Sequence, residues 1–258
     1  MSGVAVHLAA GQGKRLRPFT DDRPKPLVEL GGRSLLERNI ETLGRCGISE
    51  HVVVTGYRGD RIRELGLKTV ENPFYDRTDM VYSLFRARDE FPEDRDLIIS
   101  YGDIVYEDKI VEALLKCHNP VCVVVDLEWQ KLWEARSEDP LDDAETLRMD
   151  ENGFITEIGN KPENLEDIEA QYIGLINIRC DFIRDFVERY LTLQEDTEDG
   201  YVSVQMTNFL DSMAKDGWEI KAVPVHGGWI EVDTSEDLEM YRRMLEDGTL
   251  SKFVELRS

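Results

Sequence analysis

Glycines and basic residues alternate near the start of the chain, directly after a short apolar run. Gly11 and Gly13 are followed at once by Lys14 and Arg15, and Lys25 comes ten residues later between two prolines. Glycine has no Cβ, so backbone N–H groups there can approach a phosphate chain closely. The three cations can neutralise its charge. The pattern therefore predicts binding of a polyphosphate at the end of a first strand.

The loop matches neither of two common phosphate-binding patterns. Leu16 stands where a G-x-G-x-x-G loop needs its third glycine, and no G-K-[ST] follows as in a P-loop. A dinucleotide-dependent oxidoreductase and a P-loop kinase are therefore disfavoured. A simple glycine turn with solvated cations would explain G-x-G alone, but the full string with its second cationic element is more specific. The predicted nucleotide-binding residues of the loop are Leu8, Ala9, Ala10, Gly11 and Gly13.

Acidic residues with the spacing of a metal site occur at two places. Asp103 follows Tyr101 and Gly102 at the end of an apolar run, where a side chain can point into the ligand crevice of an α/β sheet. Glu231 and Asp233 are two residues apart, so on a strand they share one face. Three such oxygen donors, converging with phosphate oxygens, would suit Mg²⁺. The alternative is that Asp103 is a turn residue and Asp233 caps a helix.

Strands and helices alternate through the first half of the chain. Short apolar runs predict buried strands, and apolar positions three and four apart predict helices. Ser34 with Glu37 forms a capping box that begins one of these helices. Strands are expected at 4–8, 51–55, 68–70, 97–101 and 121–125, and helices at 34–46, 79–88 and 109–117. The alternation predicts an α/β fold with a Rossmann-like, doubly wound, mostly parallel mixed sheet.

The second half is expected to add a small β elaboration. Residues 150–153 carry a hairpin-turn signature between strands at 146–149 and 154–158. Asp181 and Ser235 are expected to cap two helices. Further strands are expected at 172–178, 219–224 and 229–232, and a further helix at 202–214. We see no repeat or linker, so one domain over 1–258 is expected, with halves 1–125 and 126–258.

Composition and charge restrict the classes of function. The formal net charge of the 258 residues is −22, which argues against binding to nucleic acid or to acidic membranes. Six basic and three acidic residues fall within 1–33. A local positive patch in an acidic protein indicates a small anionic ligand held at that place. The acidic surface also favours solubility, and it raises the hypothesis of a salt-rich habitat.

The expected location of the protein follows from its apolar runs, its first residues and its cysteines. No apolar run approaches the roughly 20 residues of a membrane span. The first ten residues lack the basic region of a signal peptide. The four cysteines, Cys46, Cys117, Cys122 and Cys180, are scattered without C-x-x-C spacing. Neither a zinc site nor a disulfide framework is therefore indicated, and a cytoplasmic protein is expected.

The glycine-rich string and the Pro-Lys-Pro segment together resemble the signature of the sugar-nucleotide-type nucleotidyltransferase superfamily, which includes pyrophosphorylases and cytidylyltransferases. The resemblance implies a nucleotide-diphospho-sugar transferase-like fold in which the loop binds a nucleoside triphosphate. Arg15 and Lys25, with Lys14 beside them, would stabilise the charge that develops during attack on the α-phosphorus. These three residues are the implied catalytic residues.

The same resemblance assigns the acids and the base contacts. Asp103 and Asp233 would bind Mg²⁺, with Glu231 as a third ligand. Tyr101 at the end of its strand, with Ala9 and Ala10, is a candidate to contact the base, and Gly102 lies beside it. CTP as the nucleotide is implied by the resemblance.

Three further segments resemble phosphocholine- and 2-aminoethylphosphonate-type cytidylyltransferases. They lie at 72–84, 139–146 and 171–176, and with the loop they cover most of the chain. Thr78 and Asp79 stand where that group has an Asn pair, so the contacts of this helix start stay open, and Asp79 could be its N-cap. The implied acceptor-binding residues are Lys161, Tyr82, Ser83, Asp143, Glu145, Tyr172 and Trp129.

Two of these assignments have a structural alternative. Lys161, in a Gly-Asn-Lys-Pro segment, matches a family lysine that contacts the acceptor's phosphate, but it could also be a surface turn lysine. A cationic acceptor would need aromatic faces, from Trp129, Trp133 or Tyr172, and a carboxylate from Asp143 or Glu145. The two tryptophans are four residues apart, so they could equally form a helical core stripe.

The expected protein is a Mg²⁺-dependent cytidylyltransferase. It would transfer CMP from CTP to phosphocholine, 2-aminoethylphosphonate or a hydroxyalkylphosphonate and release pyrophosphate. The alternatives are a sugar-1-phosphate nucleotidylyltransferase using UTP, GTP or dTTP, and a non-catalytic nucleotide-sensing module. Apart from these two substrates the only expected partner is a second copy of the chain, as a homodimer.

Overall fold

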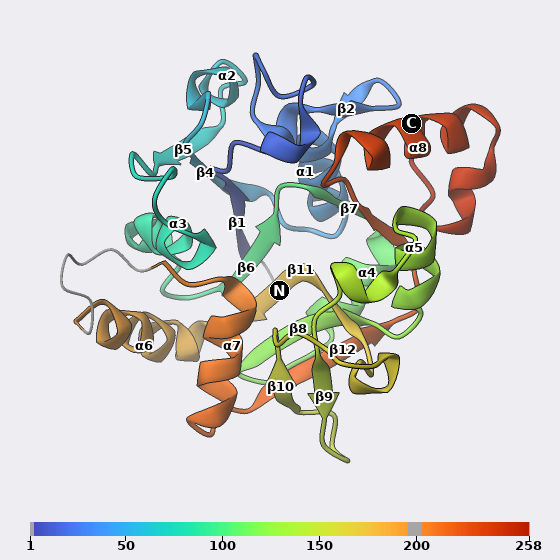
Figure 1. Ribbon diagram of the computed structural model, residues 1–258. Helices are drawn as coiled ribbons and strands as arrows, with labels where there is room; N and C mark the ends of the chain where they lie inside the picture. Colours follow the sequence, from blue (N-terminus) through green and yellow to red (C-terminus); the bar gives the residue numbers. More distant parts are fainter. Residues whose placement is uncertain (1–2, 196–202, 258) are drawn as a thin grey trace.

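Seven strands form the central sheet of the computed structural model, which describes residues 3–195 and 203–257 (Figure 1). β11 runs antiparallel to β6 and β8, whereas the other pairings in this sheet are parallel. The predicted doubly wound, mostly parallel mixed sheet is therefore confirmed. In spatial order the strands are β12 (Ile220–Val225), β8 (Val121–Asp126), β11 (Gln171–Ile178), β6 (Asp96–Tyr101), β1 (Gly3–Ala9), β4 (Glu50–Thr55) and β5 (Lys68–Glu71).

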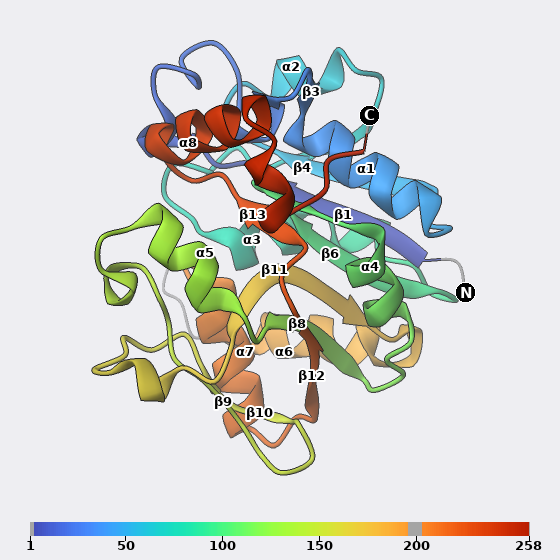
Figure 2. The same ribbon diagram turned by 90° about the vertical axis from the view of Figure 1, so that its right-hand side faces the viewer.

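Helices cover both faces of this sheet because its inner strands, such as β1, β6 and β8, are buried along almost their whole length. One hydrophobic core joins the sheet to α1 (Leu35–Arg45), α4 (Asp108–Leu115), α5 (Trp129–Arg136) and α8 (Ser235–Glu246). The other core joins it to α3 (Met80–Arg86), α6 (Ile183–Glu195) and α7 (Met206–Lys215). Figure 2 shows α1 and α4 on the side away from α6 and α7. The short α2 (Gly59–Arg63) follows β4.

Three two-stranded sheets complete the fold. The predicted hairpin is confirmed as β9 (Leu147–Met149) and β10 (Ile155–Ile158), and β2 (Glu29–Leu30) pairs with β3 (Arg33–Ser34). The third joins β13 (Trp229–Glu231) to β7 (Ile104–Tyr106), a strand that sequence reasoning missed because it has only three residues. This pairing sets Glu231 opposite Ile104, one residue from Asp103, so it brings the two predicted acidic segments together.

Two predicted helix caps are wrong, and one is confirmed. The Ser34–Glu37 capping box begins α1 as expected. Thr234, not Ser235, caps α8, because its side chain accepts from the N–H of Asp237. Asp181 lies inside a 3-10 turn (Cys180–Phe182) ahead of α6. The predicted helix at 202–214 begins at Met206, and residue 202 lies outside the described residues.

The cysteine prediction needs a correction. Cys117 and Cys122 form a disulfide, with their Cα atoms 6.3 Å apart. The turn from α4 into β8 brings them together, a geometry that a search for C-x-x-C spacing does not detect. Separately, none of the helices within residues 3–195 and 203–257 is long and apolar enough to cross a membrane.

Candidate active site

The glycine loop at the end of β1 is held against Lys25. Gly13 has a φ of 61°, and a Cβ at this position would lie 2.9 Å from the Cβ of Lys25. Thr20 Oγ1 donates to the Gly13 carbonyl at 2.8 Å and fixes the loop from the other side. A side chain at residue 13 would therefore displace the lysine. Lys14 is exposed beside the loop.

Lys25 joins the two acidic segments. Its Nζ donates to Asp103 Oδ2 at 2.7 Å and to Asp233 Oδ1 at 2.6 Å. Burial alone would lower the pKa of Lys25, but the carboxylates of Asp103 and Asp233 outweigh that effect and raise it. Arg15 Nη2 lies 2.5 Å from Asp233 Oδ2. We call Lys25, Asp103 and Asp233 the junction.

Gly102 allows the end of β6 to approach this junction. Its N–H donates to the Leu8 carbonyl at 3.1 Å. A Cβ on Gly102 would come within 2.6 Å of Pro26 Cγ and 2.7 Å of the Leu8 oxygen. Only glycine therefore lets this turn pack between β1 and the Pro-Lys-Pro segment while it presents Asp103.

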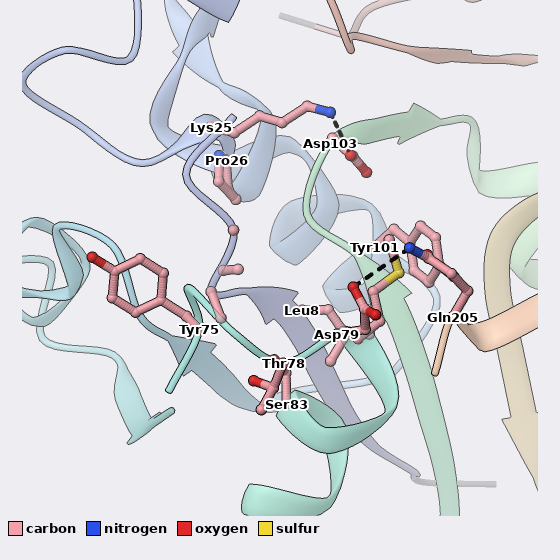
Figure 3. A pocket seen from close by; sticks show the side chains of 14 residues that line it. Leu8, Lys25, Pro26, Tyr75, Thr78, Asp79, Ser83, Tyr101, Asp103 and Gln205 are labelled. Carbon is pink, nitrogen blue, oxygen red and sulfur yellow. Dashed lines mark hydrogen bonds and ion pairs between the residues drawn. The ribbon is translucent and has the colours of Figure 1, made fainter. Parts of the chain in front are cut away.

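One cavity, the β1 pocket, opens at the carboxyl end of β1 and holds about 250 Å³ (Figure 3). Lys25 and Asp103 stand at one side of it, and Thr78, Asp79 and Ser83 lie at another. The predicted nucleotide-binding residues that line it are Leu8, Ala9, Ala10, Gly11 and Tyr101. Ser83, which was predicted to bind the acceptor, lines the same pocket.

Buried hydrogen bonds fix the far wall of the β1 pocket. Asn72 Nδ2 donates to Thr78 Oγ1 at 3.0 Å and to Ser83 Oγ at 2.9 Å. Asp79 occupies the N-cap position of α3, but its side chain makes no capping bond. Its carboxylate accepts from Ser203 Oγ at 2.8 Å and Gln205 Nε2 at 3.5 Å. The pocket thus draws on a segment far along the chain.

A second cavity, the β11 pocket, holds about 210 Å³ and shares Met80, Tyr101 and Gln205 with the first. The two pockets are therefore neighbours separated by one wall. The remaining lining residues are Arg15, Ile104, Trp133, Asp143, Glu145, Gln171, Tyr172, Ile173, Gly174, Thr207, Trp229, Glu231 and Asp233.

Carboxylates dominate the polar lining of the β11 pocket. Burial raises the pKa of Asp143 and of Glu145 above the usual range, and it raises the pKa of Glu231 to about 7 against the opposing charge of Arg136. Tyr172 stands edge-on to Tyr101, with ring centres 5.5 Å apart. Its hydroxyl is buried beside Tyr101. The pocket therefore offers negative charge and aromatic surface.

Three predicted acceptor-binding residues lie elsewhere. Trp129 is buried and packs edge-on against Trp133 at 5.8 Å, as the core-stripe alternative requires. Lys161 Nζ donates to backbone carbonyls, including that of Asp142 at 3.0 Å, so it ties down the loop before β9. Tyr82 is buried against Phe74. None of the three lines either pocket. Only Asp143, Glu145 and Tyr172 of the predicted set line the β11 pocket.

Sequence reasoning also missed residues that the structure brings to the site. Gln205 lines both pockets, although it precedes a helix and belongs to no motif. Arg136 donates a hydrogen bond to Glu231. In the sequence it is a single arginine near a helix end and belongs to no motif. Only their contacts across the fold identify them.

The junction has the donors for one metal ion shared with a substrate. In the part of the chain that the structure describes, no three His, Cys, Asp or Glu side chains gather into a metal-binding group. Glu231, the third predicted ligand, accepts a hydrogen bond from Arg136 Nη1 at 2.9 Å. Asp103 Oδ1, however, is buried and finds no hydrogen-bond partner among the residues that the structure describes. Asp103 can therefore ligate Mg²⁺ through this oxygen, and Asp233 can join it if the ion takes the place of a contact with Lys25 or Arg15, with substrate phosphates completing the coordination.

Comparison with known proteins decides the family. Residues 5–153 match the MobA-like NTP transferase domain. The chain is also 40% identical to the CTP:phosphoglutamine cytidylyltransferase of Campylobacter jejuni over 248 residues, covering 92% of this chain and 98% of that protein. The chain belongs to the MobA-like NTP transferase family. This transferase is of the cytidylyltransferase type.

One further relative is longer than this chain, and a solved structure supports the fold. The chain is 31% identical to the bifunctional IPC transferase and DIPP synthase of Rubrobacter xylanophilus, where 98% of this chain matches 55% of that protein. It thus spans about half of that relative. A CTP:phosphocholine cytidylyltransferase structure from Streptococcus pneumoniae superimposes with a TM-score of 0.70 at 19% identity, over 95% of this chain and 100% of that one.

Proposed function

We propose that this transferase uses CTP and transfers CMP to a small phosphorylated acceptor that carries an amino group. The observation that carries the proposal is the shared wall between the two pockets. Met80, Tyr101 and Gln205 separate them, and Lys25 with its two acids stands where they meet. Such an arrangement suits CTP in the β1 pocket and the acceptor in the β11 pocket.

The reaction is a direct displacement at phosphorus. An anionic oxygen of the acceptor's phosphate forms a bond to the α-phosphorus of CTP. The bond between that phosphorus and the bridging oxygen breaks, and pyrophosphate leaves with the electron pair. The attacking oxygen needs no general base because it is already ionised. The barrier therefore lies in bringing anions together and in the charge on the α-phosphate, where positioned cations act.

Lys25 and Arg15 are the proposed cations for this charge. Lys25 is buried and fixed by two carboxylates, so it needs little reorganisation when charge develops. Arg15 is more exposed, lines the β11 pocket and contacts Asp233. Bound by Asp103 and Asp233, Mg²⁺ would neutralise the phosphates and polarise the α-phosphorus.

The lining of the β11 pocket supports an amino-bearing acceptor. Asp143 and Glu145 bring negative charge to a pocket whose phosphate side is served by Arg15. An ammonium group close to these acids would lower their pKa again, since burial is what raises it. The C. jejuni relative is named for phosphoglutamine, which has both an amino group and a phosphate. Phosphorylated glutamine is therefore the first acceptor to test.

The test is pyrophosphate release with Mg²⁺ across nucleotides and acceptors. CTP, UTP, GTP, ATP and dTTP would each be combined with phosphoglutamine, phosphocholine, 2-aminoethylphosphonate, hydroxyethylphosphonate and glucose-1-phosphate. We expect turnover with CTP and an amino-bearing acceptor only. Turnover with glucose-1-phosphate would contradict the proposed acceptor, and tight nucleotide binding without any turnover would favour a sensing role.

A further inference from the structure

Arg136 is a buried arginine at the last position of α5, behind the β11 pocket. Only 6% of its side chain is exposed, and its guanidinium carbon lies 5.4 Å from the centre of the Trp133 ring. Nη1 donates to Glu231 Oε2 at 2.9 Å, while Nε and Nη2 donate to the two carboxylate oxygens of Asp237 at 3.1 and 3.2 Å. A buried charge is stable only with such partners, so its position is narrowly determined.

Asp237 transmits this constraint to the backbone of Asp233. Its Oδ2 accepts the N–H of Asp233 at 3.0 Å and the N–H of Thr234 at 2.9 Å. The carboxylate of Asp233 in turn accepts from Lys25 at the junction. Arg136 therefore holds one acid of the Glu-x-Asp pair directly and the other through a single intervening side chain.

The capping of α8 does not by itself explain the arginine. Asp237 belongs to a capping box with Thr234, and α1 has an equivalent box in Ser34 and Glu37. At α1, the hydrogen bonds to the Glu37 carboxylate within the described residues come from Ser34 alone. A capping box thus forms without a guanidinium, and Arg136 adds a connection to Glu231 that capping does not require.

We infer that Arg136 is a positioning residue for the transfer: it sets the directions in which Glu231 and Asp233 present their carboxylates to the β11 pocket. This inference rests on the proposed function, because those directions matter only if phosphates and a cation meet at the junction. When a side chain that orients metal ligands is lost, activity or metal affinity typically falls by about 10- to 100-fold.

The experiment compares Arg136→Lys with Arg45→Lys. Lysine keeps the charge of Arg136 but loses the planar fork that engages Asp237 through two nitrogens. Arg45 is a matched control because it also ends a helix and donates through two nitrogens to one aspartate, Asp108, away from both pockets. Each variant is assayed for kcat, for the KM of CTP, for its melting temperature, and for Mn²⁺ affinity in the presence of CTP by electron paramagnetic resonance.

For Arg136→Lys we expect kcat to fall about 10- to 100-fold, with weaker Mn²⁺ binding and a smaller change in the KM of CTP. Arg45→Lys should match the wild type in kcat, in Mn²⁺ affinity and in the KM of CTP. The inference is overturned if a folded Arg136→Lys protein behaves like Arg45→Lys in both kcat and Mn²⁺ affinity. A wild-type protein without turnover would refute the proposed function instead, and the Mn²⁺ titrations would still decide the role of Arg136.

A second variant covers the case in which Arg136→Lys does not fold. Asp237→Asn removes the charge that Arg136 binds while it retains the shape of the side chain. It should lower kcat and Mn²⁺ affinity in the same way. A folded Asp237→Asn protein that keeps the wild-type kcat and Mn²⁺ affinity would overturn the inference.

Discussion

The β1 and β11 pockets share a wall but are built in different ways. The β1 pocket draws most of its lining from the end of β1, the Pro-Lys-Pro segment and the start of α3, and small residues follow one another along part of its wall, at Ala9, Ala10 and Gly11. The β11 pocket is lined by larger and charged side chains from α5, the loop before β9, β11, α7 and β13. A site that binds the phosphates common to all nucleotides can be made by the backbone. A site that selects one acceptor needs side chains placed by long-range packing.

The largest expected effect is at Lys25, which lines the β1 pocket and binds Asp233 of the β11 pocket. Lys25→Ala should lower kcat by about a thousand-fold, because a preorganised cation is lost where charge develops. CTP affinity, measured by calorimetry, should fall much less. Lys14→Ala, in the exposed cation beside the loop, is the comparison and should cost far less. A Lys25→Ala protein that loses affinity but keeps its rate would contradict a catalytic role.

The next effect tests how tightly the β1 pocket is packed. Gly102→Ala would force a Cβ to within 2.6 Å of Pro26, so the free energy of unfolding should fall by about 1–3 kcal/mol. CTP binding should weaken with it. Gly44→Ala is the control, because nothing lies within 4 Å of its Cβ and helix propensity favours alanine by up to about 1 kcal/mol. Urea unfolding measures both, and equal stabilities would show that the turn can move.

A smaller effect should be confined to the β11 pocket. Glu145→Gln removes one of its negative charges, so the KM of an amino-bearing acceptor should rise about ten-fold, as expected for a lost charge-assisted hydrogen bond. The KM of CTP should not change. Asp142→Asn, in the same loop but outside both pockets, is the control. Steady-state kinetics with an unchanged acceptor KM would argue that the acceptor carries no ammonium near Glu145.

The smallest effect concerns β1 itself, beneath the β1 pocket. Burial, together with His51, lowers the pKa of His7 from 6.5 to about 3. The unfolded chain therefore binds a proton that the folded chain excludes, and stability falls as the pH drops below 6.5. Between pH 6.5 and 5.5 the loss should be about 1 kcal/mol. His7→Gln should flatten this part of the pH profile in urea unfolding, whereas the exposed His226→Gln should retain it.

Prediction from sequence succeeded where the information was local. The loop from Leu8 to Arg15, the strand that ends in Tyr101 and the Ser34 capping box depend on residues close together in the chain. Trp129 shows the opposite case. Its spacing from Trp133 was compatible with an aromatic cage or a core stripe, and only packing between α5 and the sheet decided that Trp133 lines the pocket while Trp129 is buried behind it.

The sequence by itself determined the α/β class, the order of most strands and helices, and the glycine loop after β1, because periodicity, capping and glycine spacing act over a few residues. Only the tertiary structure decided that Lys25 joins Asp103 to Asp233, that Glu231 is held by Arg136, and that Gln205 lines both pockets. These contacts bridge up to 208 positions in the chain. They depend on how β7 pairs with β13 and how helices pack on the sheet, which no local pattern specifies.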